Sequence, residues 1–238
     1  MKRPYIICHM ASSIDGKIIF DNWGDSVPKE KYSELYDKYH ESYNSQGWII
    51  GRSTAEKDFS KGIKPELIIP DTPIERKPHV HNKEAKAFAV VFDKNGKLGW
   101  NTNEIGGDHL IVILTEQVSD EYLYYLQRRG ISYIFAGKEQ ADLKLAMAQL
   151  VDVFSIEQIM LEGGGSINGS LLNEGLIDEI SLLLLPVADG TPDTASLFDI
   201  SSNLRKIPAT RLRLKSVEQL EDDVLWLRYS IDSSNAGI

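Results

Sequence analysis

The sequence predicts an α/β protein whose central sheet is mixed, mostly parallel and closed by a C-terminal antiparallel hairpin. Over most of the chain, short apolar runs alternate with longer amphipathic stretches, as expected for repeated βαβ units. In the last third, apolar and charged residues alternate instead, which is typical of antiparallel strands with one exposed face. The 238 residues show no repeat and no break in composition. We therefore predict a single domain over residues 1–232 and a frayed tail over residues 233–238.

Each predicted element follows from its local pattern. Six nearly continuous apolar runs indicate buried strands, at residues 5–10, 47–50, 88–92, 110–114, 132–136 and 156–161. Between them, one helix is predicted from Pro28 to Tyr43, a second over residues 119–129 before Gly130, and a third over residues 143–154 with Asp142 as its N-cap. At the end of the chain, an alternating run over residues 211–216 and an apolar run over residues 224–231 predict the hairpin.

Composition excludes several classes of protein. The formal net charge of -9 argues against nucleic-acid binding, which requires a basic surface. The longest apolar stretches, such as residues 182–185, are far too short to span a bilayer, and the first residues lack the pattern of a secretory signal. A single cysteine, Cys8, excludes an internal disulfide framework and a Cys-rich zinc site. We therefore predict a cytoplasmic protein with no nucleic-acid or membrane partner.

The strongest candidate site is a glycine-rich turn. A buried strand runs into Gly163, Gly164, Gly165 and Ser166, and a helix predicted over residues 167–174 ends at Gly175. Glycines let backbone amides approach a phosphate closely, and a helix N-terminus adds the positive end of its dipole. The spacing is neither a Walker A loop nor a Rossmann fingerprint. The simpler interpretation is a tight strand-to-helix turn, but one glycine usually suffices for that, so three favour anion binding.

Two carboxylates stand beside predicted strand ends. Glu162 immediately precedes the glycines, where a carboxylate is unfavourable beside a phosphate unless it binds a ribose hydroxyl or an amine, or moves a proton. The alternative is a strand-end residue with its own structural partners. Asp15 follows the first strand in Asp15-Gly16, which is a turn signal, and the same position suits a hydrogen bond to a polar ring or general acid/base chemistry.

A third strand end carries Gly51, Arg52 and Thr54. Arg52 offers a planar fork for a phosphate and Thr54 a hydroxyl N-cap, whereas the simpler interpretation is a solvated arginine and an ordinary cap. Because three strand ends each combine glycine with polar groups, we predict a cleft for a phosphorylated nucleotide and a second small molecule. His79 and His81 alone do not make a metal site, since no third ligand stands out nearby, and no metal is predicted.

These segments together resemble the reductase domain of the riboflavin-biosynthesis deaminase/reductase proteins, a family with the dihydrofolate-reductase fold. The similar segments are residues 10–17, residues 51–54 with Asp58, and residues 161–166 continuing through residues 171–179. The resemblance covers residues 4–231 and implies a three-layer α/β/α fold, NADPH as cofactor and a homodimer. It also implies reduction of a ribosylaminopyrimidine phosphate, with hydride delivered to the ribose C1′.

The resemblance assigns roles residue by residue. Thr54 and Asp58, with Gly51 and Arg52 beside them, and the turn from Gly163 to Ser166 would hold the cofactor, while Asp15 and Glu162 would face the nicotinamide and the substrate. Either carboxyl would supply a proton if burial raised its pKa. The family arginine expected after Asp58 for the substrate phosphate is absent, leaving Lys61, Lys64 and Arg76 as alternatives. The deaminase motifs are absent as well. Two other functions remain open: reduction of a pterin or folate, and nucleotide binding without turnover.

Overall fold

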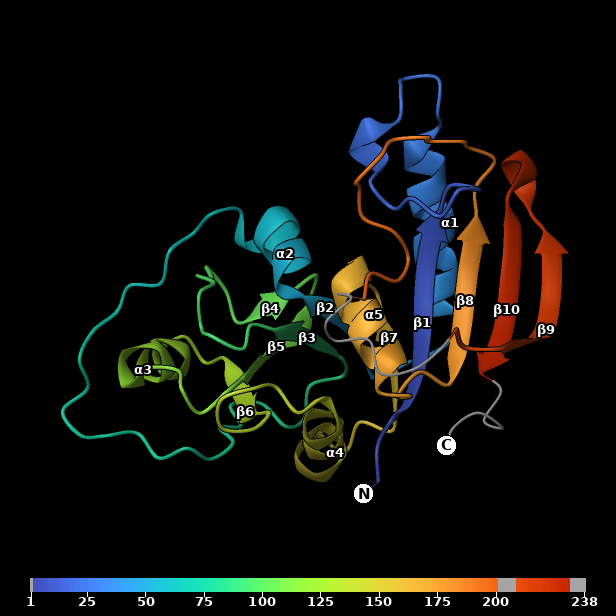
Figure 1. Cartoon of the computed structure of the whole chain (residues 1–238). Coiled ribbons are helices and arrows are strands. Elements are labelled where there is room, and N and C mark those ends of the chain that lie inside the picture. Colours follow the sequence, from blue (N-terminus) through green and yellow to red (C-terminus); the bar gives the residue numbers. More distant parts are fainter. Residues whose placement is uncertain (1, 201–208, 232–238) are drawn as a thin grey trace. The chain divides into compact units, whose positions relative to one another are not determined.

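The computed structural model describes residues 2–200 and 209–231. The chain divides into two compact units, which we call unit 1 (residues 1–4 and 46–159) and unit 2 (residues 5–45 and 160–238). Both are mixed α/β (Figure 1), so the predicted fold class is confirmed. The single domain over residues 1–232 stays a prediction, and the predicted tail over residues 233–238 lies outside the described residues. In the part of the chain that is described, no helix has the length and apolar character needed to cross a bilayer.

Unit 1 is built on a mostly parallel sheet. The strands β2 (Gly47–Gly51), β3 (Phe88–Phe92), β5 (Asp108–Leu114) and β6 (Ser132–Phe135) pair in that order and run parallel. The short strand β4 (Glu104–Ile105) pairs antiparallel with β5. The helices are α2 (Arg52–Ala55), α3 (Asp120–Arg128) and α4 (Leu143–Phe154), and the short helix η2 (Glu56–Ser60) continues from α2. The four parallel strands match four predicted apolar runs.

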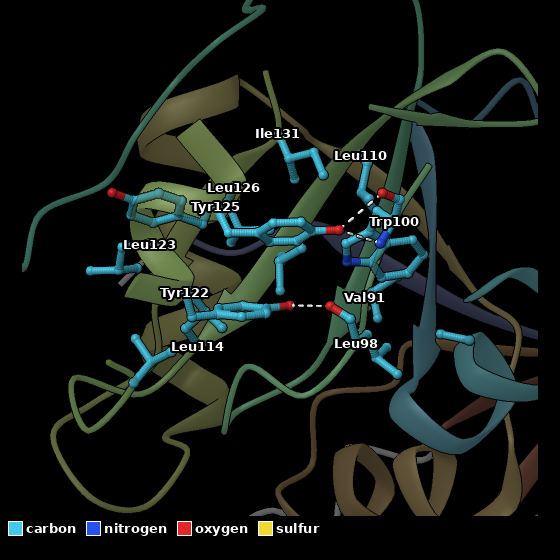
Figure 2. Close-up of a cluster of buried hydrophobic side chains, with 14 of the residues drawn as sticks. Val91, Leu98, Trp100, Leu110, Leu114, Tyr122, Leu123, Tyr125, Leu126 and Ile131 are labelled. Atoms are coloured by element: carbon cyan, nitrogen blue, oxygen red, sulfur yellow. Dashed lines mark hydrogen bonds between the residues drawn. The ribbon is translucent and has the colours of Figure 1, made fainter. Parts of the chain in front are cut away.

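Helix α3 supplies much of the core of unit 1 (Figure 2). Two of its side chains, Tyr122 and Tyr125, are almost completely buried, yet both hydroxyl groups have partners. Tyr122 donates to the carbonyl of Leu98 at 2.8 Å, and Tyr125 donates to the carbonyl of Trp100 at 2.9 Å. Because a buried phenol without a partner is destabilising, these bonds fix the segment after β3 against α3.

Unit 2 combines parallel and antiparallel strand pairs. The strand β1 (Tyr5–Ser12) pairs parallel with β8 (Glu179–Leu184), β10 (Leu225–Ile231) pairs antiparallel with β8, and β9 (Leu212–Gln219) pairs antiparallel with β10. The predicted C-terminal hairpin is therefore confirmed, with the short helix η3 (Glu221–Asp223) at its turn. Helix α1 (Lys29–Glu41) lies against β1, and α5 (Gly165–Asn173) follows the glycine turn. The strand β7 (Gln158–Leu161) leads into that turn, and η1 (Phe20–Asn22) precedes α1.

The observed first residues of the helices can be compared with the N-caps predicted from the sequence. Asp142 accepts a hydrogen bond from the backbone N–H of Leu145 at 3.0 Å, as an N-cap does. The predicted cap Thr54 is wrong, because Gly51 is the N-cap of α2 and Thr54 lies inside the helix. The reason is that β2 extends through Gly51 and the chain enters the helix directly at Arg52, leaving no intervening loop. Helix α5 likewise starts at Gly165, two residues before the predicted start at residue 167.

Candidate functional site

Asp15 lies in the turn after β1, and its carboxylate joins two loops of unit 2. The Ser13 hydroxyl donates to Asp15 Oδ1 at 2.7 Å, and the backbone N–H groups of Asp189 and Gly190 donate to the carboxylate at 3.0 and 2.9 Å. These hydrogen bonds, led by that from Ser13, hold the pKa of the exposed Asp15 carboxyl well below its usual range. Asp15 is thus an ionised acceptor that ties the turn after β1 to the loop after β8.

Glu162 occupies a different environment, at the end of β7. Its side chain is only 13% exposed, and His40 Nδ1, in the last turn of α1, lies 2.5 Å from Glu162 Oε1. The Glu162 charge also affects its buried neighbours. Burial, followed by this carboxylate, raises the pKa of the Cys8 thiol and of the Tyr36 phenol. Glu162 is therefore a partly buried carboxyl in short contact with an imidazole.

The glycine turn leads directly into α5. Gly163 has φ +92°, and a Cβ there would lie 3.2 Å from the side chain of Met10, so the position requires glycine. The peptide bond between Gly163 and Gly164 is cis. Gly164 is the N-cap of α5, and the helix start has no hydrogen bond from a capping side chain. The positive end of the α5 dipole is thus presented by backbone groups, as an anion site requires.

Gly165 has a further, intramolecular reason to be glycine. A Cβ at Gly165 would lie 2.2 Å from the carbonyl oxygen of Ser196 and 2.4 Å from the carboxylate of Asp199. At Gly169, one turn later, a Cβ would lie 2.4 Å from the Asp199 carbonyl oxygen. The N–H of Asp199 also donates to the Gly165 carbonyl at 3.0 Å. The segment around Ser196 and Asp199 therefore packs directly on the first turns of α5, and close packing explains one of the three consecutive glycines.

The remaining predicted cofactor residues lie in unit 1. Gly51 ends β2, Arg52 begins α2, Thr54 is half-buried within α2, and Asp58 is exposed in η2. The Arg52 guanidinium pairs with Glu56 Oε2 at 2.6 Å, four residues along the same helical segment. Both side chains are more than a third exposed, so this pair adds little stability. An exposed guanidinium of this kind can exchange its carboxylate partner for a phosphate.

The predicted residues therefore form two groups. Asp15, Glu162 and the turn from Gly163 to Ser166 belong to unit 2, whereas Gly51, Arg52, Thr54 and Asp58 belong to unit 1. Within unit 2, the structure adds partners that the sequence did not reveal, namely His40 for Glu162 and the Asp189–Gly190 backbone for Asp15. These partners lie more than a hundred residues away in the sequence, and no local motif marks them.

Two other polar residues singled out by sequence, Arg76 and His79, are held by contacts within unit 1. Arg76, an alternative for the phosphate-binding arginine, donates to the carbonyls of Ile74, Glu116 and Val118 and pairs with Asp120. It is thus committed to holding its own segment. His79 pairs through its backbone with Tyr133 in β6. In residues 2–200 and 209–231, no group of three or more His, Cys, Asp or Glu side chains is arranged to hold a metal ion.

Comparisons with known proteins agree with this architecture. Residues 4–226 match the family model of the RibD C-terminal domain. A protein of Aquifex aeolicus named 2,5-diamino-6-ribosylamino-4(3H)-pyrimidinone 5′-phosphate reductase is 28% identical over 228 residues, covering 91% of this chain and 92% of the relative. The protein of the same name from Methanothermobacter thermautotrophicus is 25% identical over 233 residues, covering 94% of this chain and 96% of the relative.

A solved structure shows the same fold. The pyrimidine reductase-like protein of Corynebacterium diphtheriae matches with a TM-score of 0.66 and 19% identity, covering 96% of this chain and 92% of the other. The fold and the relatives together define an oxidoreductase of the mixed α/β class. Within that class, the chain belongs to the RibD C-terminal domain family.

Proposed function

We propose that this protein reduces a ribosylaminopyrimidine 5′-phosphate with NADPH, delivering hydride to the ribose C1′ and opening the sugar to a ribityl chain. The observation that carries this proposal is the match, over more than nine tenths of both chains, to relatives named as the pyrimidinone phosphate reductase. Relatives named riboflavin biosynthesis protein RibD also match, but only 57% and 56% of their length is covered. The diaminopyrimidinone phosphate in the names of the fully covered relatives is therefore the favoured substrate.

The residues present fit a nicotinamide dinucleotide. The N-terminus of α5 has no side-chain cap of its own, and Gly163, with φ +92°, brings bare backbone to it. Such a terminus favours a phosphate. We assign Gly163, Gly164, Gly165 and Ser166 to the cofactor phosphates, and Gly51, Arg52, Thr54 and Asp58 to the rest of the dinucleotide. When bound, the reduced nicotinamide supplies the hydride.

The two carboxylates take different roles. Glu162 holds the proton that the departing ring oxygen requires, since it is partly buried and shares a short contact with an imidazole. Asp15 stays ionised and fixes the turn that faces the nicotinamide and the substrate, because three hydrogen bonds keep its pKa low. We therefore propose Glu162, and not Asp15, as the carboxyl that provides the proton.

Calorimetric titration with NADPH and then NADH, followed by a reduction assay, tests the proposal. We expect tight NADPH binding, weaker NADH binding and turnover of the diaminopyrimidinone phosphate. The deaminated aminouracil phosphate and dihydrofolate serve as competing substrates. Reduction of dihydrofolate alone would indicate a folate reductase, and binding without any turnover would indicate a nucleotide-binding module. If neither NADPH nor NADH binds, the proposed reductase function is wrong.

Amide variants test the two carboxylates separately. Glu162→Gln keeps the size of the side chain but cannot deliver the proton, so we expect kcat to fall by roughly 10²-fold to 10⁴-fold, the range of general acid catalysis, with NADPH affinity retained. Asp15→Asn should weaken the acceptor for Asp189 and Gly190 and raise KM more than it lowers kcat. Full turnover by Glu162→Gln, with intact cofactor binding, would contradict the role given to Glu162.

We also infer a homodimer in the cytoplasm. The structural support for the dimer is the strand β9, on which Leu212, Leu214 and Val217 are exposed. Exposed apolar side chains on a terminal hairpin favour association with a second copy of the chain, because association removes them from water. The support for the compartment is compositional, since the only cysteine, Cys8, is buried and free.

A further inference from the structure

Helix α1 presents polar side chains to His9 in the neighbouring strand β1 and to Glu162 after β7. Tyr36 and His40 are four residues apart and so share one face of the helix. The Tyr36 hydroxyl donates to the carbonyl of His9 at 3.0 Å, and His9 Nε2 donates back to the carbonyl of Tyr36 at 3.1 Å. This reciprocal pair, centred on a fully buried His9, fixes the position of α1 one turn before His40.

His9 itself is a neutral structural residue. Its Nε2 faces a carbonyl oxygen, which only accepts, so the proton lies on Nε2 and Nδ1 accepts from the Ser181 hydroxyl at 2.9 Å. Trp226 Nε1 donates to the same hydroxyl oxygen at 2.8 Å. Burial lowers the pKa of His9 despite the nearby Glu162 carboxylate. Both ring nitrogens of His9 are therefore engaged elsewhere, and the partner of Glu162 is another group.

His40 is placed to be that group. Its Nδ1 lies 2.5 Å from Glu162 Oε1, its side chain is 27% exposed, and it lies in the last turn of α1. Asp37, one turn earlier, adds a second carboxyl whose pKa is raised by burial and then by Glu162, and lowered by His40. His40 is thus the imidazole in contact with Glu162, and Asp37 lies on the same helical segment.

We propose that His40 is a positioning residue for the reduction, holding the Glu162 carboxyl at the end of β7 in the orientation from which its proton is delivered. This inference rests on the proposed function of Glu162. It adds a residue outside the three segments that carry the family resemblance. His40 acts through Glu162, so its removal changes turnover and leaves the cofactor site intact.

Three variants and the unsubstituted protein test this inference. His40→Ala removes the imidazole, and His40→Asn places an amide N–H near the position of Nδ1 without a titratable ring. We expect His40→Ala to lower kcat by roughly 10-fold to 100-fold, as for a misplaced catalytic group, with KM and NADPH affinity nearly unchanged, and His40→Asn to recover most of the loss. Lys38→Ala, which removes an exposed cation from the same turn, is the matched control and should keep full activity.

The coupling with Glu162 distinguishes positioning from a general structural role. In the Glu162→Gln background, His40→Ala should cause no further loss of kcat, since the group it orients is already inactive. Proton NMR gives a readout independent of turnover. A downfield resonance from the proton shared by His40 Nδ1 and Glu162 Oε1 is expected in the unsubstituted protein and in Lys38→Ala, and it should be absent from Glu162→Gln and His40→Ala.

Each outcome separates the two proposals. An unsubstituted protein that binds NADPH but reduces no pyrimidine phosphate overturns the proposed function, and with it the role of His40 in that reaction. Full activity in His40→Ala, alongside a strongly impaired Glu162→Gln, overturns the positioning role alone. Additive losses in the double variant, or failure of His40→Asn to recover activity while it folds normally, also overturn it.

Discussion

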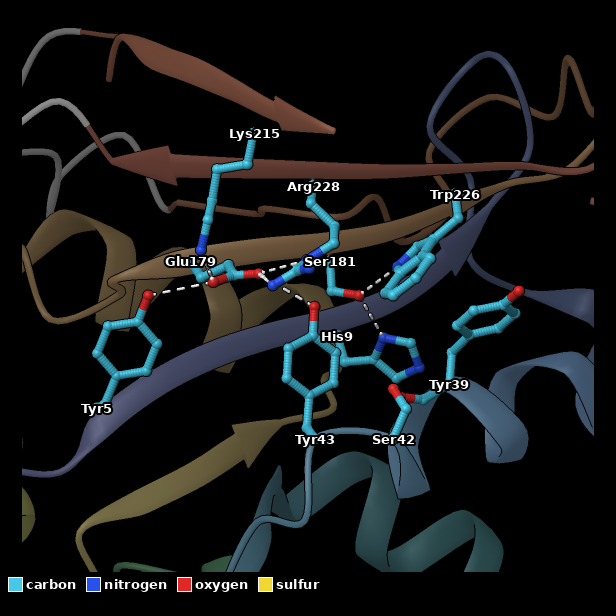
Figure 3. Close-up of polar contacts among 10 residues, drawn as sticks. All are labelled: Tyr5, His9, Tyr39, Ser42, Tyr43, Glu179, Ser181, Lys215, Trp226 and Arg228. Atoms are coloured by element: carbon cyan, nitrogen blue, oxygen red, sulfur yellow. Dashed lines mark hydrogen bonds and ion pairs between the residues drawn. The ribbon is translucent and has the colours of Figure 1, made fainter. Parts of the chain in front are cut away.

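Glu179 is a charged residue in the interior of unit 2, only 2% exposed (Figure 3). Its carboxylate accepts from Lys215 Nζ at 2.5 Å, from Arg228 Nε at 2.8 Å, and from the hydroxyls of Tyr5 and Tyr43, both at 3.1 Å. These four partners come from β9, β10, β1 and the chain just after α1. Glu179 of β8 thereby links β1, β9 and β10 to the segment that follows α1, the helix that carries His40.

Removing this carboxylate should destabilise the protein. Glu179→Ala leaves Arg228 and Lys215 without their acceptor, and breaking a buried pair costs about 3–5 kcal/mol. Because both cations reach solvent, with Arg228 29% and Lys215 38% exposed, we expect a loss of about 3 kcal/mol in urea unfolding. Glu157→Gln, which removes an exposed pair with Lys2, is the control and should change nothing measurable. Equal stability of the two variants would contradict a structural role for Glu179.

The same network predicts a pH dependence. Burial alone would raise the pKa of Glu179, but the hydrogen bonds and charges of Lys215 and Arg228 outweigh it and lower the pKa. A carboxyl with a lower pKa in the folded state stabilises that state above its unfolded pKa and loses this contribution as the pH falls through the folded value. The stability difference between the unsubstituted protein and Glu179→Gln should therefore be full at neutral pH and shrink in acid. A difference that grows in acid would reverse the sign and refute the argument.

The roles of single residues could be predicted from the sequence where they depend only on neighbouring residues in the chain. The N-cap Asp142 and the terminal glycines Gly130 and Gly175, both at φ +67°, follow from short-range rules. Glu162 could be singled out because it adjoins three glycines. Its partner His40 could not, because that contact joins residues 122 positions apart and depends on how α1 packs on β1.

At the scale of elements, the start of α5 is defined by the segment that packs on it. Ser196 N–H and hydroxyl groups donate to the Asp199 carboxylate, and Asn168 Nδ2 donates to the Leu197 carbonyl at 3.0 Å. With the close approach at Gly165 and Gly169, these bonds hold residues 196–199 against the helix. Any change that pushes this segment away also alters the helix N-terminus that we assign to the cofactor.

Gly165→Ala tests this packing. The new Cβ would overlap the Ser196 carbonyl, which is backbone and cannot rotate away, so we expect a loss of about 1–3 kcal/mol in stability, as for overpacking, and weaker NADPH binding. Gly24→Ala is the matched control, since a Cβ there would meet nothing within 4 Å. Denaturant unfolding and calorimetry measure the two effects. A Gly165→Ala protein as stable as Gly24→Ala would show that residues 196–199 move aside freely.

Elements were predicted well where their apolar pattern was continuous and less well elsewhere. Strand β3 has the predicted bounds, whereas β8 is missing from the predicted strands although its sequence is largely apolar. Glu179 and Ser181 interrupt the pattern of β8, and the structure shows that both are buried because they have polar partners. Thr54 was misplaced because a strand-to-helix junction without a loop leaves no capping position for its hydroxyl.

At the scale of the whole molecule, the C-terminal hairpin has an exposed apolar face that the sequence only partly revealed. The alternation over residues 211–216 predicted one exposed face, but β9 shifts register between Arg228 and Tyr229 of its partner β10. Leu214 pairs with Tyr229 and Val217 with Leu227, residues of β10 that are two apart and so share a face. The bulge therefore brings Leu214 and Val217 to the same side of the sheet.

This face is the surface through which we expect the homodimer to form. Leu214 is 58% exposed and Val217 is 53% exposed, and exposed apolar patches on a sheet commonly mark an interface. Light scattering after gel filtration should give twice the chain mass for the unsubstituted protein. The double variant Leu214→Glu, Val217→Glu should give the monomer mass, because two carboxylates would have to be desolvated in the interface.

A control on the same strand separates loss of the interface from loss of the strand. Glu218 is exposed on β9 and pairs with Trp226, whose side chain packs on the opposite face with Tyr39 of α1. Glu218→Gln should therefore leave the dimer intact. A monomeric unsubstituted protein would refute the homodimer, and a dimer that survives both glutamates would move the interface away from this face. If the double variant is monomeric and still binds NADPH, each copy of the chain holds a complete cofactor site, and association serves the stability of the hairpin.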